Sequence, residues 1–207
     1  MPVEPADRVE ALDVLRGVAL FGVLTVNLVT IFRHSLFEEF LHGPEDAWAR
    51  AVSFGLEFKA VTLFSLLFGI GLEAQRERID GFDRYIVRRL VFLLVVGLVH
   101  LFLFWNGDIL TLYALCGLVV APLLRLPTRA LLGLAILLFV LQIVPVPYPP
   151  PFGTAADLRE HVEAADRAYR YGTFVQALKF RIEEVRPMGV LLVSIVPRTV
   201  GLFLLGA

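Results

Sequence analysis

Six runs of mainly apolar residues constrain this chain more than any other feature of its sequence. Each run holds roughly 17 to 25 residues, which is the length that a helix needs to cross the hydrocarbon core of a bilayer. Inside that core every backbone polar group must find its partner within the segment, so we expect helices. The sequence predicts an all-α, polytopic membrane protein, a single membrane domain over residues 1–207 with six spans at 13–32, 51–72, 88–105, 109–125, 129–146 and 188–206.

Composition supports this class and excludes others. Hydrophobic residues make up 57% of the chain and charged residues only 19%, with a mean hydropathy of +0.75. The formal net charge of −1 leaves no basic surplus for nucleic acid phosphates, so no nucleic acid partner is expected. The single cysteine, Cys116, rules out an internal disulfide and a thiolate metal cluster. The bilayer is therefore the first partner of this chain, and no metal site is predicted.

The distribution of arginines predicts the orientation of the spans. The loop between the second and third runs holds five arginines, and two more bracket the turn between the fourth and fifth runs; together they are Arg76, Arg78, Arg84, Arg88, Arg89, Arg125 and Arg129. Lys and Arg accumulate in cytoplasmic loops, so both loops and the N-terminus, with Arg8, are expected on the cytoplasmic side. The mixed charges of the long outer segment 147–187 fit the rule poorly, as long loops often do.

This outer segment begins with a break in helical structure. The prolines of residues 145–151 cannot continue a helix, but apolar residues recur near helical spacing between Thr154 and Val185. We expect one or two amphipathic helices that lie on the outer interface or cap the bundle. The sixth apolar run reaches Ala207 without a polar tail. This ending predicts that the sequence is the N-terminal part of a longer protein, or that a second chain or another copy in a homo-oligomer completes the fold.

Two polar residues inside apolar runs are the candidates for chemistry. Asn27 follows Arg16, and His100 follows Arg89, each after ten intervening residues. At a rise of 1.5 Å per residue both side chains lie roughly 16 Å above an arginine, near the middle of the bilayer. A shared cavity at that depth is feasible if the two helices adjoin. Histidine can act as a general base or acid and asparagine can stabilise an oxyanion, although either can instead hydrogen-bond a neighbouring helix.

The remaining candidates have two interpretations each. Asp13 and Arg16 either form an ion pair in the first turn or contribute, with Arg89, to holding an anionic substrate group. Trp105 and Asp108 lie in a tight turn at the outer interface, where Trp belongs to the aromatic belt and Asp caps the next helix; alternatively both contact a substrate. Three further histidines are weaker candidates: His34 and His42 as exposed bases, and His161 as a solvated side chain.

Short catalytic and nucleotide-binding motifs do not occur in the sequence. It contains no Walker loop, no dinucleotide glycine pattern after a strand, no HExxH and no GxSxG. Gly69 and Gly71, in an apolar run, instead predict close packing between helices.

Five ordered motifs resemble the YeiB-type family of bacterial inner-membrane proteins. They cover most of residues 8–125: LDVLRGVAL from Leu12 with Asn27 downstream, LFSLLFGIG from Leu63, RRL from Arg88, GLVH from Gly97, and FWNGDILTLYA from Phe104. The resemblance implies a multi-pass protein of the bacterial inner membrane, about twice as long as this chain.

That family is in turn similar to heparan-alpha-glucosaminide N-acetyltransferase and to membrane acyltransferases that modify sugars. The aspartate, arginine and polar residue of their first helix match Asp13, Arg16 and Asn27. The resemblance implies transfer of an acyl group from cytoplasmic acyl-CoA to an outer acceptor, with no tightly bound cofactor. His100, which belongs to the YeiB-type motif, is the favoured base, Arg16 and Arg89 the phosphate ligands, and Asp108 an acceptor contact.

Two other classes of function remain open from the sequence. The same polar cavity could pass a small solute across the membrane without covalent chemistry, or the chain could be a non-catalytic membrane scaffold. Whether His100 and Asn27 line one cavity that opens toward Arg16 or Arg89 distinguishes the acyltransferase arrangement from both.

Overall fold

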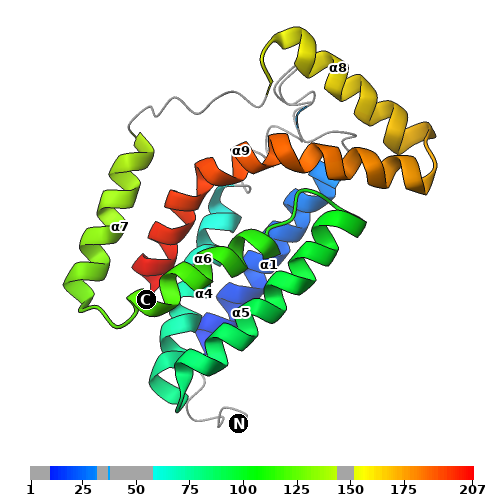
Figure 1. Ribbon diagram of the computed structural model, residues 1–207. Helices are drawn as coiled ribbons and strands as arrows, with labels where there is room; N and C mark the ends of the chain where they lie inside the picture. The colour runs from blue at the N-terminus through cyan, green and yellow to red at the C-terminus, as the bar shows by residue number, and fades with distance from the viewer. Residues whose placement is uncertain (1–9, 32–36, 38–57, 144–151) are drawn as a thin grey trace.

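The computed structural model describes residues 10–31, 37, 58–143 and 152–207, and the regular elements within them are all helices. The predicted all-α class is therefore confirmed for this part of the chain. In the described ranges, seven α-helices and two short π-helices, whose turns are one residue wider, follow one another (Figure 1). Their bounds are α1 Glu10–Ile31, α4 Phe58–Arg78, α5 Phe82–Val99, η3 His100–Phe104, α6 Leu110–Leu123, α7 Thr128–Ile143, α8 Ala155–Asp166, η4 Arg167–Tyr171 and α9 Phe174–Gly206.

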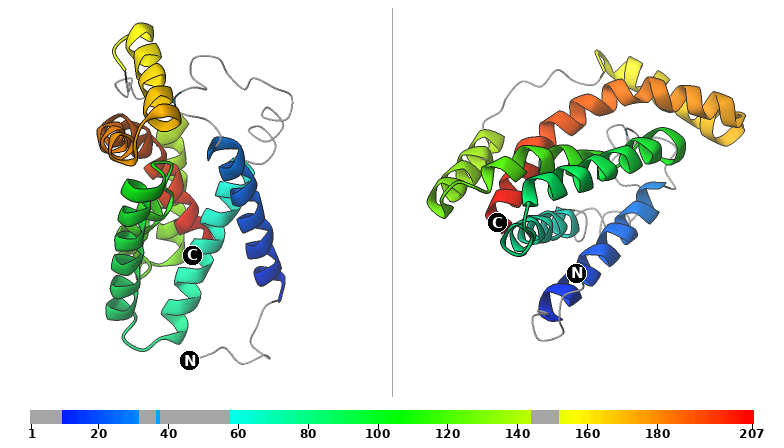
Figure 2. Two further views of the ribbon diagram at one scale, coloured as in Figure 1. Left: turned by 90° about the vertical axis from the view of Figure 1, so that its right-hand side faces the viewer. Right: turned by 60° about the horizontal axis from the view of Figure 1, so that its bottom comes forward.

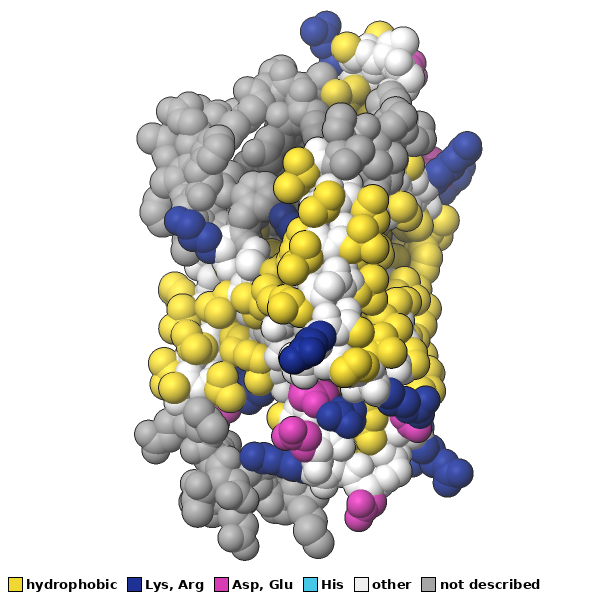
Figure 3. Space-filling model, turned by 90° about the vertical axis from the view of Figure 1, so that its left-hand side faces the viewer, with side chains coloured by type: hydrophobic (Ala, Val, Ile, Leu, Met, Phe, Trp, Pro, Cys, Tyr) yellow, Lys and Arg dark blue, Asp and Glu magenta, His cyan; other side chains and the backbone are white. Residues whose placement is uncertain are grey.

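Within the described residues, three helical segments are long and apolar enough to cross a membrane. They are Ala11–Leu28 within α1, Phe82–Phe104 formed by α5 and η3, and Phe174–Gly206 in α9. Helices α6 and α7 have only 14 and 16 residues, so the structure supports a membrane protein but not the six predicted spans. Figure 3 shows one face of the molecule, on which hydrophobic side chains form a band and charged side chains gather below it.

The helices pack as a bundle around α4 and α9. Helix α4 contacts α1 and α9, and α9 also contacts α6 and α7 along its length. Helix α1 lies at the edge of the bundle beside α4, as the views in Figure 2 show. Helix α5 packs against α6 on another side, so α1 and α5 are not the neighbours that a shared Asn27–His100 cavity requires.

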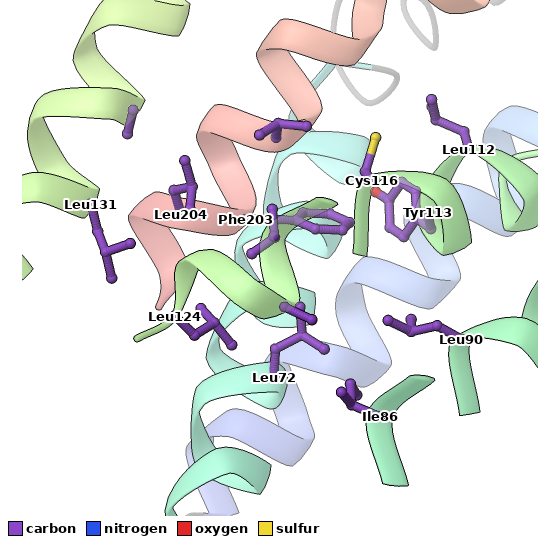
Figure 4. Packing of buried hydrophobic residues seen from close by; sticks show 14 of the residues in the cluster. Leu72, Ile86, Leu90, Leu112, Tyr113, Cys116, Leu124, Leu131, Phe203 and Leu204 are labelled. Atoms are coloured by element: carbon purple, nitrogen blue, oxygen red, sulfur yellow. The ribbon is translucent and has the colours of Figure 1, made fainter. Parts of the chain in front are cut away.

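The core lies where α4, α5, α6, α7 and α9 converge (Figure 4). Tyr113 of α6 and Phe203 of α9 are fully buried there, with their rings edge to face at 5.1 Å. Leu72 of α4 and Ile86 and Leu90 of α5 complete the centre of this cluster. Lipid tails are as apolar as these side chains, so the cluster stabilises the bundle by close van der Waals packing and fixes how the five helices cross.

Glycines allow the closest helix crossings. A Cβ atom at Gly69 would clash with the backbone carbonyl group of Phe203, so the predicted packing role of Gly69 is confirmed. At Gly97 a Cβ atom would lie 2.6 Å from the backbone nitrogen of Thr111, which brings α5 and α6 together. Gly71 differs, because its nearest neighbour is a guanidinium nitrogen of Arg16 at 3.7 Å. Gly71 therefore faces a polar region rather than a tight crossing.

The described part of the predicted outer segment, residues 152–187, differs from its predicted boundaries. It forms α8, η4 and the first part of α9, which continues without a break through Pro187 to Gly206. The predicted start of a separate span at residue 188 does not exist, because the Thr173 side chain caps the helix from Phe174 onward and Gln176 completes a capping box. Helix α8 and the start of α9 lie at one end of the bundle (Figure 1). The proline run at 145–151 and Arg8 lie outside the described residues.

Candidate functional site

The candidate site is built around the turn that joins η3 to α6. Helix α5 changes to π-helical hydrogen bonding at His100, so the Trp105 amide donates to the His100 carbonyl oxygen at 2.9 Å. Such wide turns occur often at functional sites because they displace side chains from the regular helical face. The backbone then leaves the helix at Trp105, in an extended conformation, and re-enters helix α6 at Leu110.

His100 and Asp108 form a hydrogen-bonded pair across this turn. The Nδ1 atom of His100 lies 2.9 Å from Oδ1 of Asp108. The Asp108 side chain is fully buried, whereas the His100 side chain is 37% exposed. Asp108 also accepts hydrogen bonds from the backbone amides of Leu110, at 3.2 Å, and Thr111, at 2.7 Å. The predicted capping of the fourth apolar helix by Asp108 is confirmed.

This geometry holds the imidazole in one orientation. A carboxylate that engages Nδ1 fixes the orientation of the ring and stabilises the imidazolium that forms when Nε2 takes a proton. Because Asp108 is itself fixed by two amides of α6, the direction of the His100 ring is set by the helix start.

A cavity of about 360 Å³ adjoins the buried side of the turn. Asn27, Trp105 and Asp108 line it, so three of the predicted site residues meet at one cavity. His100 is not among the lining residues and reaches this cavity only through Asp108. The remaining wall comes from α4, α6 and α9 and includes Ser194.

Arg16 and Arg89 meet at a second cavity, of about 390 Å³. The guanidinium of Arg89 donates to Gln75, whose amide in turn donates to the Gly71 carbonyl oxygen at 2.5 Å. Asp13 does not line the cavity, but its carboxylate lies 3.1 Å from the Arg16 guanidinium, which confirms the predicted first-turn ion pair.

The two cavities share no lining residue. Arg16 and Asn27 are eleven positions apart on α1, so the cavities lie at levels roughly 16 Å apart.

Arg198 is a site residue that the sequence analysis missed. It lies in α9 and lines the same cavity as Asn27 and Asp108. The sequence did indicate this residue, because placing an arginine within an apolar run costs free energy at membrane depth and makes it a candidate functional residue. The lining of this cavity therefore combines the cation of Arg198, the carboxylate of Asp108 and the amide of Asn27.

Glu184 forms a second polar cluster that the sequence analysis also missed. Its side chain is only 1% exposed. The Asn106 amide donates to it, the Tyr169 hydroxyl donates at 3.3 Å, and Nε2 of His161 lies 3.0 Å away. Burial, together with the nearby negative charge of Glu184, raises the pKa of Tyr169 to about 12 and keeps its hydroxyl protonated. Glu184 thus joins the 105–108 turn to α8 and η4.

His161 is not the solvated side chain that its charged surroundings predict. Its side chain is 16% exposed and lies among three phenylalanine rings, with centroid distances of 5.4 Å to Phe37, 4.7 Å to Phe152 and 5.1 Å to Phe180. The burial of His161 was not predicted, because the acidic and basic residues between 157 and 184 indicated a solvent-exposed helix face.

The described residues contain no cluster of three or more His, Cys, Asp or Glu side chains that could hold a metal ion. His34 and His42 lie outside the described part of the chain.

The long apolar helices and the polar cavities between them define the class, a helical membrane protein. Comparison then gives the relatives. The chain is 38% identical to the uncharacterized protein YxaH of Bacillus subtilis over 159 residues, or 70% of this chain and 39% of YxaH. It is 34% identical to an uncharacterized 39.9 kDa protein from the amylase 3′ region of Bacillus acidopullulyticus, over 67% of this chain and 41% of that protein. It is also 38% identical to the uncharacterized protein YeiB of Escherichia coli, over 58% of this chain and 32% of YeiB.

These relatives support the resemblance to YeiB-type proteins, and their names assign no activity. The chain spans about two fifths of the length of the first curated relatives that it matches. No family model matches the sequence. No solved structure matches the chain.

Proposed function

We propose that this chain forms part of a membrane acyltransferase in which His100 is the general base and Asp108 orients it. The observation that carries the proposal is the 2.9 Å contact between Nδ1 of His100 and the buried Asp108 carboxylate. This contact leaves Nε2 to accept a proton from the hydroxyl or amine of an acceptor. A similar arrangement of base and orienting carboxylate serves acyl transfer on unrelated folds.

The reaction balances as a simple transfer from an acyl-CoA thioester. The acceptor oxygen or nitrogen forms a bond with the acyl carbonyl carbon as its proton passes to Nε2 of His100. The carbon–sulfur bond then breaks, and the imidazolium returns the proton to the departing thiolate. Because Asn27 lines a cavity that His100 does not, the two side chains do not meet the cavity criterion stated from the sequence, and the donor to the oxyanion of the intermediate is not assigned to Asn27. Since His100 does not line the cavity of Asp108 and Trp105, the acceptor reaches Nε2 from the exposed side of the imidazole.

Arg16 and Arg89 are the proposed ligands of the donor phosphates. Two guanidinium groups at one cavity suit a polyanion, because each can form paired hydrogen bonds with phosphate oxygens. Asp13 holds Arg16 in place through their ion pair. The donor is long, so it can hold its phosphates at the arginines while its thioester lies at the level of His100, which is eleven positions, or about 16 Å, beyond Arg89 on the same helical segment. No tightly bound cofactor is needed.

Purified protein in lipid nanodiscs tests this function. We expect release of free thiol from acetyl-CoA, accelerated by an amine or sugar acceptor, and loss of that release in the His100→Gln variant. Lys59→Gln is a matched control, because Lys59 is an exposed residue at the start of α4 that lines neither cavity. Equal rates for wild type and His100→Gln would contradict the role of His100.

Transport of a small anion is the second candidate function. One observation favours it. Each cavity contains arginine, Arg198 in the first and Arg16 and Arg89 in the second, whereas His100 lines neither cavity. Proteoliposomes loaded with a labelled organic anion separate the two candidates. Flux that needs Arg198 and Arg16, without thiol release from acetyl-CoA, supports transport and excludes the acyltransferase.

We further propose a multi-pass protein of the bacterial inner membrane in which α4, α6 and α7 also cross the bilayer, with the N-terminus in the cytoplasm. Because the sequence has one cysteine, Cys116→Ser gives a background for site-directed labelling. A cysteine at Arg84 should react from the cytoplasmic side and one at Glu160, in α8, from the outer side. Whether another copy or a second chain completes the fold is tested by the mass of the purified particle.

A further inference from the structure

A groove lies on the face of α5 that points away from the helix bundle. The proposed reaction uses none of its residues except Arg89. The groove has a volume of about 940 Å³ and runs from the turn before α5 along that helix as far as Val95. We call it the basic groove. Its charged end contains Asp80, Arg84, Arg88 and Arg89, and its apolar part contains Phe92 and Val95. This combination of charge and apolar surface on one helix needs an explanation.

The basic groove lies on the face of α5 that points away from the bundle. The buried residues Ile86 and Leu90 mark the packed face. Arg84, Arg88 and Val95 follow one another at spacings of four and seven residues, so they share the opposite face. Phe92 is 71% exposed and Val95 is 54% exposed. Nothing in the described part of the chain therefore covers this face.

Two arginines of the basic groove, Arg84 and Arg88, differ from Arg76 and Arg125 at the same end of the bundle. Arg76 is bound by Glu73 at 2.5 Å, and Arg125 is bound by Asp83. By contrast, no ion pair joins Arg84 or Arg88 to a carboxylate among the residues that the structure describes. The groove holds three guanidinium groups against the single carboxylate of Asp80, so its charged end is electropositive.

We propose that the basic groove binds one anionic phospholipid, with its phosphate on Arg84 and Arg88 and an acyl chain along Phe92 and Val95. Four residues of helix separate the two arginines by about 6 Å, which lets both guanidinium groups bracket one phosphate. Val95 lies about 10 Å further along the helix than Arg88, at the depth where acyl chains begin. A free phosphate would use only the charged end, whereas a phospholipid matches both parts of the groove.

Lipid binding in nanodiscs tests the proposal. The probe is phosphatidylglycerol, titrated into phosphatidylcholine nanodiscs that contain the full chain, and the readout is lipid retained by the protein in native mass spectrometry. We expect retention of one phosphatidylglycerol molecule in preference to phosphatidylcholine. Arg84→Gln and Arg88→Gln should each weaken its apparent affinity about fivefold, since one basic residue near a membrane surface contributes about 1 kcal/mol.

Arg129→Gln is the matched control, because it removes an exposed arginine from the start of α7, outside the groove. It should retain the lipid as the wild type does. Circular dichroism confirms that the variants remain helical. Equal retention of phosphatidylcholine and phosphatidylglycerol overturns the proposal, as does the same loss in Arg129→Gln and Arg88→Gln. Displacement of the lipid by an equal concentration of inorganic phosphate also overturns it, because the acyl chain would then contribute nothing.

Discussion

Two histidine–carboxylate pairs flank the 105–108 turn, and they differ in what surrounds them. In both pairs the carboxylate is buried, with Asp108 at 0% and Glu184 at 1% side-chain exposure. The histidines differ, since His100 is 37% exposed and His161 only 16%. His161 lies among aromatic rings, whereas one side of His100 remains open.

The other partners of each carboxylate explain the difference in role. Asp108 accepts from backbone amides of the helix that it caps, so it is a fixed local support for one imidazole. Glu184 accepts from Asn106 and Tyr169, which belong to separate elements, and so connects distant parts of the chain. Similar residue pairs therefore suit proton exchange at His100 and structural support at His161.

The largest expected effect separates the two histidines by activity. His100→Ala should lower acyl transfer by about 10²-fold or more, because a positioned base contributes roughly 10² to 10⁴ to a rate. His161→Gln should leave at least a third of the activity, as its ring lies outside both cavities. Thiol release from acetyl-CoA measures both variants. Similar losses for the two would remove the distinction between the pairs.

The next effect separates the two carboxylates by stability. Glu184→Ala deprives Asn106, Tyr169 and His161 of a buried acceptor and should destabilise the protein by about 3 kcal/mol. Its neighbour on α9, Glu183, is exposed, so Glu183→Ala should stay within about 0.5 kcal/mol of the wild type. Denaturant unfolding in detergent micelles gives both values, and a similar loss for Glu183→Ala would refute a special role for Glu184.

A smaller effect tests the double role of Asp108. Asp108→Asn keeps an oxygen that can accept from the Thr111 amide, so helix α6 should lose less than about 1 kcal/mol. The neutral side chain no longer stabilises an imidazolium, so acyl transfer should fall roughly tenfold or more. Rate and melting temperature are measured on the same preparation. A variant that melts early and keeps its rate would show that Asp108 is only a cap.

The smallest effect concerns Tyr169 and alkaline pH. Its pKa is raised from 10.0 to about 12 in the folded protein, so folding favours the protonated hydroxyl. The stability linked to this group is complete below pH 10 and is lost as pH rises toward 12. Tyr169→Phe should cost about 1 kcal/mol at neutral pH, for the lost hydrogen bond, and should show a shallower decline than the wild type over that alkaline range. Parallel unfolding curves would contradict this linkage.

Local features of this fold were predictable, and long-range ones were not. Apolar length predicted the helices, spacing predicted the Asp13–Arg16 pair, and residue type predicted the cap at Asp108. Each depends on residues within one or two helical turns. The predicted meeting of Asn27 with His100 depends on which helices adjoin, and α1 packs on α4 instead of α5. Equal depth in a bilayer does not specify proximity.

Buried charge was the least predictable part of the candidate site. Glu184 has exposed neighbours in the sequence, and its burial depends on Asn106, 78 positions earlier in the chain. Arg198 was detectable, because it interrupts an apolar run. The difference is physical: a charge in an apolar run departs from its local background, whereas a buried charge among other charges does not.

The crossing of α4 and α9 at Gly69 determines which sequences can share this fold. Any side chain at position 69 collides with the backbone at Phe203, which cannot move aside as a flexible side chain can. Around Gly17, Gly133 and Gly189, by contrast, an added methyl group meets no atom within 4 Å. Among homologues that keep this arrangement, position 69 should therefore be invariant while those three positions drift, so natural variation itself records where the two helices touch.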